Sequence, residues 1–72
     1  MINKEMVYNY LIRFLPVVDT NIPRFKRDCQ RAIDQGADQN TAAMLQAFIA
    51  DNALDSDRVR ATWNAYNQDQ KL

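Results

Sequence analysis

Apolar side chains recur every three to four residues along this chain, in four short segments separated by polar turns. This spacing places them on one face of an α-helix, whereas a half-buried strand would alternate apolar and polar residues. No segment alternates in that way, and no Asn-Gly or Asp-Gly pair marks a β-hairpin. The pattern predicts helices over about Asn3–Leu15, Ile22–Gln35, Asn40–Asp51 and Ser56–Gln68.

Polar residues at the segment boundaries are well placed to cap these helices. Asn, Asp and Thr side chains accept a hydrogen bond from a first-turn amide, so they mark where a helix begins. Asp55 as a cap also puts Leu54 and Val59 at the spacing of a hydrophobic staple. The expected N-caps are Asn3, Thr20 or Asn21, Asp38 or Asn40, and Asp55.

Proline and glycine mark two of the helix ends. Pro16 removes a backbone donor and disfavours helix at Leu15, so the first helix should stop or kink there. Gly36 is the only glycine and follows the second apolar segment directly. We expect it to adopt the left-handed conformation that ends many helices. The tail after Gln68 is expected to fray.

The apolar faces together predict the fold class. A chain of 72 residues forms one small domain, spanning residues 1–72, with a correspondingly small core. We expect an all-α fold, a small four-helix bundle or three helices plus one, with short connections. Tyr66 continues the apolar face of the fourth helix towards the C-terminus. The residues expected in the core are Val7, Leu11, Phe14, Leu15, Val18, Ile22, Phe25, Cys29, Ala32, Ile33, Met44, Leu45, Phe48, Ile49, Val59 and Trp63.

Composition excludes most enzymatic chemistry. The chain has no histidine, one cysteine, one glutamate and one glycine. A His-based triad, a Cys/His zinc site and a Gly-rich phosphate loop therefore cannot be built, and no catalytic residue, metal site, cofactor or small-molecule substrate is expected. No apolar run is long enough for a signal peptide or a membrane span, and Cys29 is unpaired. These features predict a non-enzymatic cytoplasmic protein without membrane contact.

Charge is balanced overall but not along the chain. Nine basic and nine acidic residues cancel, yet the second helix is basic and residues 34–57 carry five aspartates and no basic residue. One interpretation is a basic surface for a partner; the other is a solvated helix face, with aspartates that serve as caps. The basic residues of the expected partner surface are Arg24, Lys26, Arg27 and Arg31.

Tyrosines suggest where a partner binds. Tyr8 and Tyr10 flank the apolar stripe of the first helix and Tyr66 lies near the C-terminus. Tyrosine is enriched at protein interfaces, and a chain this small gains buried area by associating. The favoured function is therefore a protein–protein interaction module, inhibitor or regulator, of the kind that phages and plasmids encode. Its partner would be a host protein or a second copy in a homodimer.

An alternative function is DNA binding by a helix-turn-helix-like unit within residues 40–68. Arginine suits guanine edges and asparagine suits adenine edges. The unit would bind nucleic acid through Arg58, Arg60, Asn64 and Asn67. The turn lacks a glycine, the aspartates at its end would face phosphates, and the net charge is zero. These three features count against this alternative.

Overall fold

The structure, a computed structural model that describes all 72 residues, consists of four α-helices and one 3₁₀ helix. Helices make up 74% of the chain and there is no strand, which confirms the expected all-α bundle. None of these helices has the length and apolar character to cross a membrane. The elements are α1 (Lys4–Phe14), the 3₁₀ helix η1 (Leu15–Thr20), α2 (Ile22–Asp34), α3 (Gln39–Ala50) and α4 (Ser56–Tyr66).

An asparagine or aspartate caps the start of every α-helix. Each side chain accepts a hydrogen bond from the backbone amide three residues later, at 2.8–3.1 Å. This bond satisfies one of the amides that a helix leaves unpaired in its first turn. The predicted caps are confirmed, and the open choices are settled as Asn3, Asn21, Asp38 and Asp55.

The expected helix end at Gly36 is confirmed, and the one expected at Pro16 is confirmed only in part. Gly36 has a φ of 93° and follows α2 directly, which confirms the left-handed residue. After Phe14 the chain does not leave the helical path but tightens into η1, with Pro16 in its first turn. Leu15 and Val18, three residues apart, face inward in η1, because a 3₁₀ helix has three residues per turn.

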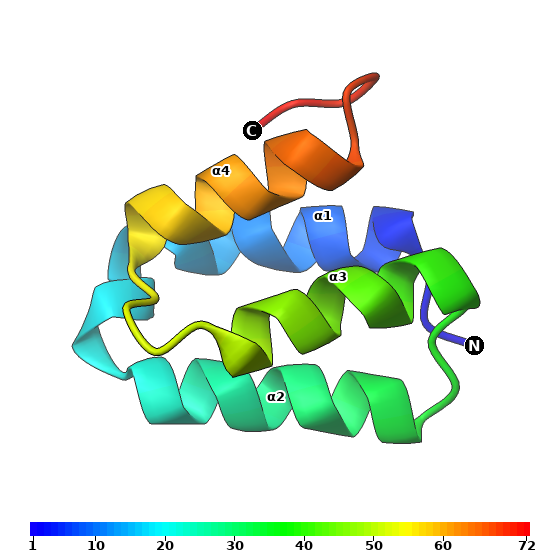
Figure 1. The fold of residues 1–72 in the computed structure, drawn as a ribbon, viewed down its shortest axis with the longest axis horizontal. Coiled ribbons are helices and arrows are strands. Elements are labelled where there is room, and N and C mark those ends of the chain that lie inside the picture. The colour runs from blue at the N-terminus through cyan, green and yellow to red at the C-terminus, as the bar shows by residue number, and fades with distance from the viewer.

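The core lies where the four apolar faces meet. Its most deeply buried large side chains are Trp63, Phe48, Leu11 and Met44. In Figure 1, α3 lies between α2 and α4, and its backbone approaches both of them. α1 crosses the bundle at a greater backbone distance from α2 and contacts the core through its side chains.

Phe14, which is expected in the core, is on the surface, and so is Tyr66 at the end of α4. Phe14 is 45% exposed: it is the last residue of α1 and packs on Tyr10, whereas the next residues of the stripe, Leu15 and Val18, are buried as expected. Tyr66 is 50% exposed, and the neighbouring Asn67 is buried in its place. Asn67 donates hydrogen bonds to the Trp63 carbonyl and the Met44 sulfur. The expectation of an apolar face reaching Tyr66 is therefore wrong by one residue at the end of α4.

The C-terminal tail is fixed, which contradicts the expectation that it frays. The Trp63 indole Nε1 donates to the Gln70 carbonyl at 2.6 Å. The Asn64 side chain exchanges two hydrogen bonds with the backbone of Leu72, at 2.7 and 3.2 Å. A buried tryptophan needs an acceptor for its N–H, and the returning tail supplies it. The tail therefore turns back and lies along α4 (Figure 1).

Candidate partner-binding groove

A surface groove runs between the end of α1 and η1 on one side and α2 on the other. Its walls have different chemistry: Phe14 and Val17 supply apolar surface, and Arg24 and Arg31 supply positive charge. The two arginines lie seven residues apart in α2, so they project from the same helix face. We call these four residues, with Tyr10 and Asp28 between them, the aromatic–arginine groove.

The apolar wall of the groove consists of large side chains that lie on the surface and are not packed into the core. Val17 is 52% exposed and Phe14 is 45% exposed, with the Tyr10 ring packed against Phe14 at a centroid distance of 4.6 Å. Large apolar side chains that gather at one place on the surface of a small protein often mark an interaction site. The ring of Phe14 is therefore held in position and open to a partner.

The arginines of α2 have no carboxylate partner within the chain. The ion pairs of the structure join Lys4 to Asp69, Arg58 to Asp51 and Arg60 to Asp57. Arg24, Arg27 and Arg31 are all exposed and take part in none of them. Two of these unpaired guanidinium groups line the groove, where they are available to carboxylates of another molecule.

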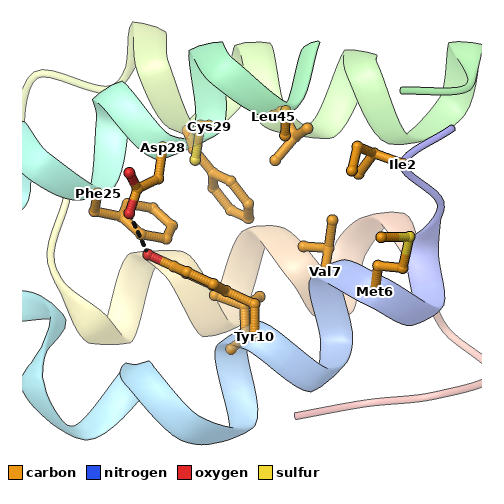
Figure 2. Close-up of a pocket in the computed structure, with 11 residues that line it drawn as sticks. Ile2, Met6, Val7, Tyr10, Phe25, Asp28, Cys29 and Leu45 are labelled. Atoms are coloured by element: carbon orange, nitrogen blue, oxygen red, sulfur yellow. Dashed lines mark hydrogen bonds between the residues drawn. The ribbon is translucent and has the colours of Figure 1, made fainter. Parts of the chain in front are cut away.

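Tyr10 and Asp28 connect the two walls. The Tyr10 hydroxyl donates to the Asp28 carboxylate at 2.9 Å, across the space between α1 and α2 (Figure 2). Burial raises the pKa of Tyr10, and the neighbouring carboxylate of Asp28 raises it further. The phenol therefore stays protonated, and the Asp28 carboxylate has a donor inside the protein.

The structure brings together some of the residues predicted to bind a partner and separates others. Tyr10, Arg24 and Arg31 share the groove. The other predicted residues lie elsewhere. Tyr8 packs on Trp63 at a centroid distance of 5.6 Å, and Lys26 donates to the Asp51 carbonyl at 2.7 Å.

Two more of the predicted residues lie outside the groove, and two residues that were not predicted lie in it. Arg27 is exposed on α2 outside the groove, and Tyr66 lies on α4 away from it. The sequence analysis missed Phe14 and Val17 as surface residues. The only sequence signal for Phe14 was its place at the predicted end of the helix, two residues before Pro16.

The residues suggested for DNA reading all have partners within the chain. Arg58 pairs with Asp51 at 2.5 Å, and Arg60 pairs with Asp57 at 3.7 Å, both at the surface. The Asn64 amide binds the tail, and Asn67 is buried. The two arginines are thus exposed on α4, whereas Asn67 is not available to a base edge.

No group of three or more His, Cys, Asp or Glu side chains lies close enough together to hold a metal ion. Comparisons of the chain with protein-family models, with curated proteins and with solved structures find no match.

Proposed function

We propose that this chain is a small protein-binding module that acts as a regulator or inhibitor through the aromatic–arginine groove. The observation that carries the proposal is the exposed Phe14 ring opposite the unpaired guanidinium groups of Arg24 and Arg31. Aromatic residues and arginine dominate the binding energy of protein interfaces. The proposal places the chain in the cytoplasm, where a single unpaired thiol such as Cys29 stays reduced.

The chemistry of the groove defines the partner that fits. Its apolar wall suits an aliphatic or aromatic side chain, and its basic wall suits carboxylates on the same segment. An acidic segment with an apolar anchor satisfies both, because carboxylates can take bidentate hydrogen bonds from arginine. A host protein is the favoured source of this segment. A second copy of the chain is the other source, since its aspartates are concentrated in residues 34–57.

The test is affinity capture from the source cell with variants matched in exposure. Val17→Ala truncates the groove wall, whereas Ile12→Ala truncates an equally exposed residue (both 52%) that lies outside the groove. Arg31→Glu reverses a groove charge, and Arg27→Glu reverses a charge on the same helix outside it. We expect Val17→Ala and Arg31→Glu to weaken capture by about tenfold or more, and the two controls to retain it.

Circular dichroism on all four variants separates lost binding from lost folding. Equal capture by the groove variants and their controls would refute the role of the groove. A partner released by nuclease treatment, with binding that weakens steeply as salt rises, would favour the DNA-binding alternative. Sedimentation of the free protein distinguishes a host partner from self-association, because only the latter gives a concentration-dependent mass.

A further inference from the structure

A second hollow lies inside the bundle, under α1 and against α2 and α3. It has a volume of about 220 Å³, and ten of its eleven lining residues are apolar. Figure 2 shows Ile2 and Met6 at one end and the Tyr10–Asp28 hydrogen bond at the other. The inner surface is formed by Val7, Leu11, Phe25, Cys29, Leu45 and Phe48, all of them buried.

One hydrogen bond lies near each end of the hollow. Near Ile2 the Asp38 amide donates to the Ile2 carbonyl at 3.1 Å, which ties the start of the chain to the start of α3. At the other end Tyr10, in the middle of α1, donates to Asp28 of α2 at 2.9 Å. Protein cores usually contain few voids larger than a water molecule, because neighbouring groups collapse into them. Walls that are joined near both ends of the hollow resist this collapse, so the hollow persists.

The location of the hollow restricts the size of its occupant. A stable protein interface buries about 800 Å² on each partner. Here most of the lining residues are already buried, and only a rim that includes the half-exposed Met6 opens to solvent. The space exposed at this rim is far smaller than such an interface. A small molecule can enter it, and an engineered apolar cavity of about 150 Å³ in another protein stays dry and binds benzene.

The lining also restricts the charge of the occupant. Asp28 is the only ionised side chain on the wall, and its carboxylate already accepts the Tyr10 hydroxyl. Burial raises the pKa of the Cys29 thiol to about 12, so this group stays neutral. A charged ligand would lose its hydration without gaining an opposite charge. Water would find polar partners only at the Tyr10–Asp28 end.

We propose that the hollow is a binding site for one small, neutral, apolar molecule of the size of benzene or a short branched hydrocarbon. The ligand packs between Phe25, Phe48 and Leu45, with its edge towards the Cys29 sulfur. This site differs from the aromatic–arginine groove, because it is lined by apolar residues and has no arginine, and its most buried lining residues are not part of the groove. The two share only the wall formed by Tyr10, Phe25, Asp28 and Ala32.

Titration of the whole protein with benzene, followed by methyl proton–carbon NMR, tests the proposal. We expect saturable shifts of the Val7, Leu11 and Leu45 methyls, which line the hollow, and little change at Leu54 and Val59 in the core outside it. If the shifts of all methyls grew linearly with the benzene concentration and did not saturate, the proposal would be overturned.

Variants that fill the hollow give an independent readout. Cys29→Met extends a flexible thioether into the space, and Ala32→Leu fills it from the next turn of α2. Both should abolish the saturable shifts, whereas Ala61→Leu on the exposed face of α4 should preserve them. Saturable binding that survives in a folded Cys29→Met variant would place the ligand elsewhere and refute the site. Val17→Ala should bind benzene normally, so failure of the groove proposal and failure of this one are distinguishable.

Discussion

Replacement of Trp63 by alanine tests whether this side chain is the centre of the bundle. Trp63 is fully buried, packs against Tyr8 at 5.6 Å and donates its indole N–H to the Gln70 carbonyl at 2.6 Å. Loss of so large a buried side chain costs about 3–5 kcal/mol. The lost aromatic pair can add about 0.5–1.5 kcal/mol. A domain of this length has a total stability of roughly 4–11 kcal/mol, so Trp63→Ala should be partly or fully unfolded.

The assay is urea unfolding followed by far-UV circular dichroism. Trp63→Phe keeps a ring against Tyr8 and loses the hydrogen bond to the tail, so it should be destabilised less than Trp63→Ala. Tyr66→Ala, on the same helix but half exposed, should change the free energy of unfolding by no more than about 0.5 kcal/mol. If the free energy of unfolding of Trp63→Ala lay within about 1 kcal/mol of the wild-type value, the assignment of Trp63 to the core would be refuted.

Four further predictions concern the backbone, a contact between distant segments and two titrating groups. Gly36→Val should destabilise more than Gly36→Ala in thermal unfolding; a Cβ there meets no atom, so the cost arises from the φ of 93° alone. Asp19→Ala removes both hydrogen bonds to Ser56 at the start of α4 and should cost about 1–2 kcal/mol, and an unchanged urea midpoint would contradict this. Hydrogen bonds from the first-turn amides of α3 lower the pKa of Asp38 below 3.8, so its contribution to stability should disappear as pH falls below that value, and the Asp38→Asn variant should lack this component. The pKa of Tyr10 is raised above 10.0, so its contribution is complete below pH 10 and lost as pH rises beyond it; ultraviolet titration should show one delayed phenolate that is missing in Tyr10→Phe.

Local features of this fold can be predicted from sequence because they depend on neighbours along the chain. Asp55 caps α4 through an amide three residues away, and Gly36 ends α2 by its own backbone conformation. The apolar spacing likewise identifies Leu11, Phe48 and Val59 as buried, since a helical stripe needs only a period.

Features that depend on the relative position of helices could not be predicted in this way. The Asp19 carboxylate meets Ser56 across 37 residues, and Tyr10 meets Asp28 across 18. No periodicity encodes such pairs. The hollow likewise follows from the distance between α1 and α2. The aromatic–arginine groove has the same origin, so Tyr10, Arg24 and Arg31 were recognised from the sequence but Phe14 and Val17 were not.

The position of Cys29 makes access to the hollow measurable. The chain has a single cysteine, so a thiol reagent labels one site and gives one rate. Its sulfur faces the hollow under α1 and is almost fully buried, so a reagent reaches it only by entering the hollow through the rim or during local opening of the bundle. At fixed pH the labelling rate therefore reports how readily a small molecule reaches this space, and an apolar ligand bound there should slow it. Ambient oxidation is slowed by the same burial, so solutions of the pure protein should remain free of disulfide-linked dimers.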